Sequence, residues 1–105
     1  VICEYFNENL DLLRATEGYY QMIGRKQEEW ELHGRHLQQW IVPEDWPKIQ
    51  KALEQAGEQM EQGAEIVFRQ IHPNGDILWT YARIVFLAES GGRRIFCALL
   101  GYIGE

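Results

Sequence analysis

The chain has 105 residues, of which 46% are hydrophobic and 25% are charged. This size suits one compact domain, and the composition excludes disordered and collagen-like chains. The net charge of −6 argues against a nucleic-acid partner, which would require a basic surface. No apolar run approaches the roughly 20 residues that span a bilayer, so we expect no direct membrane insertion of this domain.

The first quarter of the chain predicts a hairpin and a short helix. Residues 1–6 are β-branched and aromatic, and a turn-prone segment separates them from a second short run over residues 10–14. Thr16 suits the N-cap of the following helix, and Gly24 suits the position just after its end. Residues 26–39 predict short helical pieces and loop.

The strongest helical pattern runs from residue 44 to residue 62. Its apolar side chains recur at steps of three and four residues, which places them on one face: Trp46, Ile49, Leu53, Ala56 and Met60. Acidic residues in the first turn favour the positive end of the helix dipole. Gly63 is a suitable stop.

Everything after residue 64 predicts antiparallel sheet. The Asn74-Gly75 pair favours a tight hairpin turn because both residues tolerate positive φ. Both faces of this sheet are apolar, so we expect one to cover the core and the other to meet helices or a partner chain. The three expected strands span residues 65–72, 77–87 and 94–103.

The two cysteines, Cys3 and Cys97, lie in apolar runs at opposite ends of the chain. Small secreted domains usually carry more cysteines than this, so we expect buried free thiols in a reducing, cytoplasmic compartment. A single disulfide between them is the alternative.

Four segments, taken in chain order, resemble motifs of the PAS family. The third segment, Trp40–Trp46, resembles the stretch that opens the long connecting helix of these domains. The fourth, Phe68–Trp79, resembles their hairpin motif, and its Arg69 and Trp79 are typical of the fold-3 type. The match covers nearly the whole chain. The four segments are Gly24–Glu29, His33–Leu37, Trp40–Trp46 and Phe68–Trp79.

This resemblance implies an α+β fold, with a five-stranded antiparallel sheet in the order 2-1-5-4-3, helices packed on one face and a small pocket between them. It also implies a sensory module without catalytic activity, comprising residues 1–105 of a longer bacterial signalling protein. The chain begins with Val1 rather than Met, which fits such a fragment. The parent protein could be anchored in a membrane.

The expected partners are a small-molecule ligand, a second copy of the domain, and a covalently linked effector. The effector would be a histidine kinase, or a diguanylate cyclase or phosphodiesterase. The alternative is a ligandless PAS domain that acts as a dimerisation or protein-interaction scaffold.

The cofactor stays unknown at this point, but two are disfavoured. Haem-binding relatives place a ligand histidine on the long helix, and residues 44–62 contain none. Flavin photosensors carry a reactive cysteine in a stretch that matches Gly34–Gln39, where this chain has His36 instead. The acidic residues near His33 and His36 do not complete a familiar zinc pattern and no cysteine lies nearby, so we expect no metal site.

Enzymatic activity has little support in the sequence. The only serine, Ser90, lies in a glycine-rich turn, and no cysteine is placed with a histidine and an acid. A small isomerase of the cone-shaped α+β type would need a buried Asp/His pair, and His72 and Asp76 lie at a turn where we expect both to be exposed.

The remaining candidates are binding residues. Arg69 could bind a ligand carboxylate or pair with Glu65 or Asp45, and the aromatic residues could fill the core or line a pocket. The candidates for the ligand pocket are Tyr20, Ile23, Trp40, Ile49, Leu53, Phe68, Arg69, Trp79, Tyr81 and Phe96. The candidates for a dimer interface are the apolar and aromatic residues of the first segment, Val1, Ile2, Tyr5 and Phe6.

Overall fold

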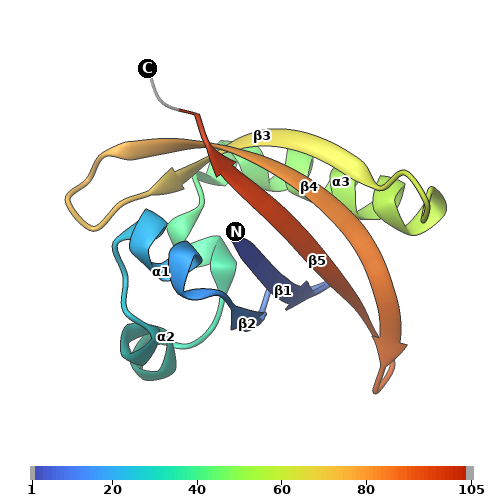
Figure 1. The fold of residues 1–105 in the computed structure, drawn as a ribbon, viewed down its shortest axis with the longest axis horizontal. Coiled ribbons are helices and arrows are strands. Elements are labelled where there is room, and N and C mark those ends of the chain that lie inside the picture. Colours follow the sequence, from blue (N-terminus) through green and yellow to red (C-terminus); the bar gives the residue numbers. More distant parts are fainter. Residues whose placement is uncertain (1, 104–105) are drawn as a thin grey trace.

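A computed structural model describes residues 2–103, and it contains one antiparallel sheet of five strands. The strand order is β2-β1-β5-β4-β3, which confirms the predicted order (Figure 1). The long hairpin of the last two strands forms the middle of the sheet and follows its twist. The strands are β1 (Cys3–Asn7), β2 (Leu12–Ala15), β3 (Ala64–Ile71), β4 (Ile77–Ser90) and β5 (Arg93–Tyr102).

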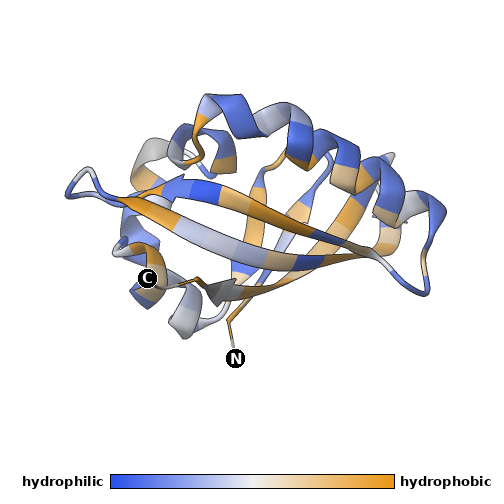
Figure 2. Cartoon of the chain, turned by 90° about the horizontal axis from the view of Figure 1, so that it is seen from above, coloured by the Kyte–Doolittle hydropathy of each residue, from blue (hydrophilic) through white to orange (hydrophobic). Residues whose placement is uncertain are grey.

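The helices pack on one face of this sheet, as predicted (Figure 1). The longest, α3, lies along β3 and β4, with a largely hydrophilic surface turned away from the sheet (Figure 2). No helix in residues 2–103 is long and apolar enough to cross a membrane. The helical elements are α1 (Glu17–Ile23), α2 (Gln27–His33), the 3-10 turns Leu37–Trp40 and Pro43–Asp45, and α3 (Trp46–Glu58).

The end of α3 differs from the prediction. The helix stops at Glu58, four residues early, and Met60 is 57% exposed instead of lying on the buried face. Gly57 weakens the last turn because glycine is a poor helix former. The chain must also reverse direction before β3, and Gly63 makes this reversal with a φ of 72°.

The core lies between the inner face of the sheet and the helices. Side chains alternate along β4, so Thr80, Ala82 and Ile84 are buried while the residues between them face outward. The outer face of the sheet is uncovered in residues 2–103 and is largely apolar, apart from the exposed Glu65 and Arg83. It carries the exposed side chains of Val67, Trp79, Tyr81, Leu87 and Leu99.

Candidate ligand-binding site

A small cavity lies inside the core, between the sheet and the helices. Its volume is about 20 Å³, which is room for about one water molecule. Two of the predicted pocket residues, Ile49 and Phe68, line it, and its walls are apolar except for Glu4. The cavity therefore has the position expected of a PAS pocket but a very small volume.

Glu4 is the unusual group in this cavity. Its side chain is on β1, it is 5% exposed, and its Oε2 has no hydrogen-bond partner in residues 2–103. The Tyr19 hydroxyl lies near it but is likewise unpartnered. Burial raises the pKa of the Glu4 carboxyl to about 7. The nearby Tyr19 hydroxyl lowers this pKa, but by less than burial raises it. Glu4 can therefore exchange a proton near neutral pH.

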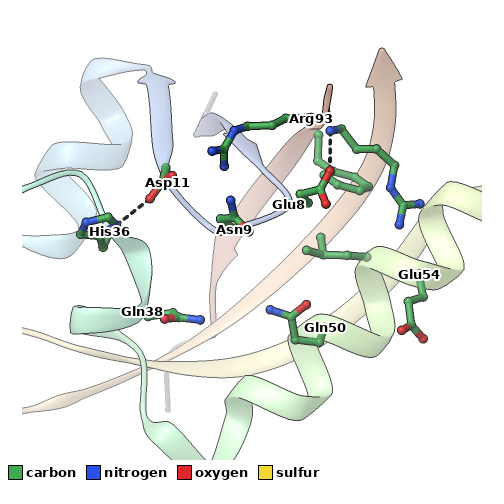
Figure 3. A pocket seen from close by; sticks show the side chains of 11 residues that line it. Glu8, Asn9, Asp11, His36, Gln38, Gln50, Glu54 and Arg93 are labelled. Atoms are coloured by element: carbon green, nitrogen blue, oxygen red, sulfur yellow. Dashed lines mark hydrogen bonds and ion pairs between the residues drawn. The ribbon is translucent and has the colours of Figure 1, made fainter. Parts of the chain in front are cut away.

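A much larger polar pocket opens beside the core, where four segments of the chain meet (Figure 3). Its volume is about 640 Å³, within the range of small-molecule sites. The predicted pocket residues Leu53 and Phe96, both buried, contribute its apolar part. The polar residues that line it are Glu8, Asn9, Asp11, His36, Gln38, Gln50, Glu54, Arg93 and Arg94.

The turn between β1 and β2 forms one wall of the polar pocket, and Asn7 holds its shape. The Asn7 side-chain oxygen accepts hydrogen bonds from the backbone N–H groups of Asn9 and Asp11, each at 3.0 Å. Leu10, at a positive φ of 63°, completes the tight reversal. This turn therefore presents Glu8, Asn9 and Asp11 to the pocket in a fixed arrangement.

Two contacts join this wall to its neighbours (Figure 3). His36 Nδ1 lies 2.6 Å from Asp11 Oδ1, which connects the turn to the segment before the first 3-10 turn. Glu8 Oε1 accepts a hydrogen bond from the Arg94 backbone N–H at 2.7 Å, which connects the turn to β5. These two contacts therefore tie the β1–β2 turn to two neighbouring walls of the polar pocket.

Two amides in the pocket are free. Gln38 and Gln50 point toward one another from the first 3-10 turn and from α3 (Figure 3). Within residues 2–103 neither side chain has a hydrogen-bond partner, and Arg93 has no ion-pair partner. An amide offers both donors and an acceptor, so these groups can bind a polar molecule.

Arg69 lies elsewhere, in a pair with Asp45, one of the two partners predicted for it. Its Nη2 donates to Asp45 Oδ1 at 2.8 Å and its Nε to Oδ2 at 3.1 Å, and its backbone N–H also donates to Oδ2. Asp45 is 2% exposed, and its contact with Arg69 lowers the pKa of its carboxyl. The side of the guanidinium that a ligand carboxylate would use is therefore occupied.

Three other pocket candidates lie on α1 and at the end of the first 3-10 turn. Tyr20 and Ile23 are buried, and Trp40 is partly buried in an edge-on contact with Trp30. The guanidinium carbon of Arg25 lies 3.3 Å from the centre of the Trp40 ring. Tyr20 also borders a separate surface groove of about 470 Å³.

The structure does not bring Trp79 or Tyr81 to either pocket. They lie on the outer face of the sheet and are 48% and 36% exposed. Their strand is apolar on both faces, so the sequence did not indicate which alternate residues point inward.

The candidates for a dimer interface on β1 point to opposite faces of the sheet, because side chains alternate along a strand. Phe6 is 2% exposed and stacks on Phe96 in the core, so its side chain is not available to a partner. Tyr5 is partly exposed on the outer face, and Ile2 is partly buried. Val1 lies outside the described residues.

The polar lining of the larger pocket was missed in the sequence. The sequence indicates only a turn at Glu8 and Asn9 and only a solvated helix surface at Glu54. The lining residues as a whole come from four distant segments, and no local spacing shows that they converge. Among the described residues, no group of three or more His, Cys, Asp or Glu side chains is placed to hold a metal ion.

The comparisons with known proteins identify the family. A family model described as PAS fold matches residues 12–99, so the chain belongs to the PAS family, in the fold-3 type that its motifs resemble. PAS domains are in general sensory modules without catalytic activity. The search of curated proteins found no match.

Solved structures share this fold at low sequence identity. A PAS domain from a two-component sensor histidine kinase is 19% identical, with a TM-score of 0.70 over 97% of this chain and 84% of that one. A PAS domain from Desulfitobacterium hafniense is 17% identical, with a TM-score of 0.72 over 97% and 92%. A LOV domain from a blue-light-activated histidine kinase of Erythrobacter litoralis is 14% identical, with a TM-score of 0.72 over 99% and 96%.

Proposed function

We propose that this chain is the ligand-sensing PAS domain of a longer bacterial signalling protein, and that a small polar molecule binds in the polar pocket. The observation that carries the proposal is a pocket of about 640 Å³ with fixed walls and two unpartnered amides, Gln38 and Gln50. The linked effector is a histidine kinase or a cyclic-di-GMP enzyme. The cytoplasm is the proposed location, supported by the low cysteine count, since a small secreted domain usually carries more than two cysteines.

The chemistry of the lining narrows the class of ligand. Gln38 and Gln50 suit a carboxamide, imide or hydroxyl edge, because each amide can donate and accept. Arg93, from β5, offers a cation for a carboxylate or phosphate group. Glu54 can accept from an ammonium group. The proposed ligand is therefore a small dipolar metabolite such as an amino acid.

The position of the pocket supports a relay to the effector. Phe96 and the two arginines belong to β5, the last strand, and β5 pairs with both β1 and β4 in the middle of the sheet. A ligand that contacts these residues therefore alters the strand from which the chain leaves the fold. This route requires no catalytic group.

A thermal-shift screen tests the proposal. The panel comprises the proteinogenic amino acids, four-carbon dicarboxylates and nucleobases, and we expect at least one compound to raise Tm by several degrees, because binding to the folded state stabilises it. The double change Gln38→Ala and Gln50→Ala should abolish the shift. The matched control Gln55→Ala, on the exposed side of α3, should retain it. A panel without any hit, or a hit that survives the double change, would contradict the site.

A second candidate is the ligandless dimerisation scaffold, supported by two observations. The interior cavity holds only about one water, and the outer face of the sheet exposes Val67, Trp79 and Leu99. Sedimentation velocity at micromolar concentration should then show a dimer that Leu99→Glu dissociates. Leu32→Glu, at an exposed leucine on α2, is the matched control and should leave the dimer intact. A monomer at all concentrations would exclude this candidate for the isolated domain.

A further inference from the structure

The two cysteines, 94 residues apart in sequence, are neighbours in the fold. Cys3 on β1 and Cys97 on β5 are both free thiols, and their sulfur atoms lie 3.3 Å apart. The register pairs Cys3 with Leu99 and Tyr5 with Cys97, so the cysteines are diagonal neighbours on the outer face. No local sequence pattern predicts this proximity, because it depends on the pairing of the first strand with the last.

The geometry is close to that of a disulfide. An S–S bond is ~2.05 Å long, so the sulfurs must approach each other by roughly 1.3 Å, which requires side-chain rotation together with a small shift of the two strands toward each other. The backbone of Cys3 is held, since its N–H donates to Thr16 Oγ1 and its carbonyl accepts from the Thr16 N–H. Diagonal positions are about 7–8 Å apart in an ideal antiparallel pair, slightly beyond the usual Cα separation in disulfides. The bond would therefore be strained and readily reduced.

The two thiols differ in access. Cys3 is buried, whereas Cys97 is partly exposed and is the sulfur that an oxidant reaches first. Burial, followed by the hydrogen bond with Cys3, raises the pKa of the Cys97 thiol to about 12. The thiolate fraction is small at neutral pH, so Cys97 reacts slowly with a peroxide.

We propose that Cys3 and Cys97 form a reversible intramolecular disulfide when the domain meets a peroxide. The Cys97 thiolate attacks one peroxide oxygen, the O–O bond breaks, and the departing hydroxide takes up a proton to leave as water. Cys97 is then a sulfenic acid. The Cys3 sulfur attacks it, the S–O bond breaks, and a second water leaves as the S–S bond forms. Two thiols and one hydrogen peroxide thus yield one disulfide and two waters.

The disulfide would join the first strand to the last. It would close a loop that contains nearly the whole chain, and long loops give the largest loss of entropy in the unfolded state. Even with strain in the bond, Tm should rise by about 10 °C or more for a domain of this size. The crosslink would also prevent β1 and β5 from moving apart, independently of any ligand in the polar pocket.

Intact-mass analysis of the 105-residue chain after hydrogen peroxide treatment tests this inference. We expect a loss of two hydrogen atoms, protection of both cysteines from iodoacetamide, migration as a monomer on a non-reducing gel, and reversal by dithiothreitol. Diamide, which oxidises dithiols directly, should give the same product if peroxide is slow. Cys3→Ser and Cys97→Ser should each lose the product while their reduced forms melt close to the unchanged chain.

Three results would overturn the inference. One is that both cysteines remain open to iodoacetamide after diamide, or accumulate as separate oxidised acids, while circular dichroism shows a folded chain. The other is that disulfides form only between chains. The third is that the chain with both Cys3→Ser and Cys97→Ser still shows the rise in Tm after oxidation, because the rise would then come from another group.

Discussion

Asp45 at the start of α3 binds Arg69 on β3 through both of its carboxylate oxygens, and it also accepts a hydrogen bond from the Arg69 backbone N–H. This contact joins the long helix to an edge strand of the sheet at the point where the helix begins. Its geometry is that of a bidentate ion pair, in which both charged groups are satisfied. The helix and the sheet therefore have a fixed relative position on this side of the core.

Asp45→Asn should destabilise the domain by about 2–3 kcal/mol, because it leaves the Arg69 guanidinium without its counter-charge and breaks a hydrogen-bonded contact with a buried group. Urea unfolding measures the loss. Glu44→Gln, at the exposed neighbouring position, should change the free energy of unfolding by less than about 0.5 kcal/mol. Equal effects of the two changes would show that net charge, rather than this contact, is responsible.

The same pair predicts an acid dependence. Arg69 lowers the pKa of Asp45 below its ordinary value of 3.8, so the folded state binds this proton less tightly than the unfolded state does. The stabilisation is present above that ordinary value and is lost as the pH falls through the lowered pKa. A series of urea midpoints in acid should therefore fall less steeply for Asp45→Asn than for the unchanged chain. Parallel curves would contradict the assignment.

The Glu4 carboxyl predicts a pH dependence of folding stability that is opposite in sign to that of Asp45. Its pKa is raised from 4.5 to about 7, so the folded state binds this proton more tightly. The corresponding stabilisation is complete below pH 4.5 and is lost as the pH rises through about 7, a change of about 3 kcal/mol. Glu4→Gln should remove this loss and unfold at higher urea than the unchanged chain at pH 8. The exposed Glu58→Gln should keep it, and a flat profile for the unchanged chain would disprove the shift.

Gly63, which turns the chain from α3 into β3, should not tolerate a side chain. Its φ is 72°, and a Cβ atom there would clash with the Ile84 carbonyl oxygen. Gly63→Ala should therefore cost about 2–4 kcal/mol, from left-handed strain together with a backbone clash. Gly75→Ala has a similar positive φ but nothing within 4 Å of the new atom, and it should cost only about 1 kcal/mol. If thermal denaturation shows the same loss for both, the clash is relieved elsewhere.

Much of the fold could be predicted because its signals are local. Gly24 ends α1 at a φ of 70°, and Asn74-Gly75 forms the β3–β4 turn. Thr16 precedes α1 as predicted, although its hydroxyl bonds Cys3 and makes no capping hydrogen bond to the helix. The strand order was predicted from the resemblance to the PAS family and not from a local signal. The end of α3 was wrong because the apolar repeat continues to Met60 in the sequence, whereas the chain must already turn toward β3. The end of the helix is therefore set by the position of β3 in the fold and not by the local apolar pattern.

The candidate site was less predictable. Leu53 and Phe96 were found because apolar residues on a helix and a strand face the same interior. The groups that could bind a polar ligand, Gln38 and Gln50 above all, are surface-type residues with no distinguishing spacing. Their meeting depends on how the first 3-10 turn packs beside α3. The proximity of Cys3 and Cys97 depends in the same way on the pairing of β1 with β5.

The central claim, that the polar pocket binds a small dipolar molecule, is tested most directly by two-dimensional NMR of the isotope-labelled chain titrated with each compound of the amino-acid, dicarboxylate and nucleobase panel. The account predicts saturable shifts for a binding compound, largest in the β1–β2 turn, the first 3-10 turn, the middle of α3 and the start of β5. The same compound should give no such shifts in the chain with Gln38→Ala and Gln50→Ala. Spectra that do not change with any compound, or shifts confined to the outer face of the sheet, would contradict it.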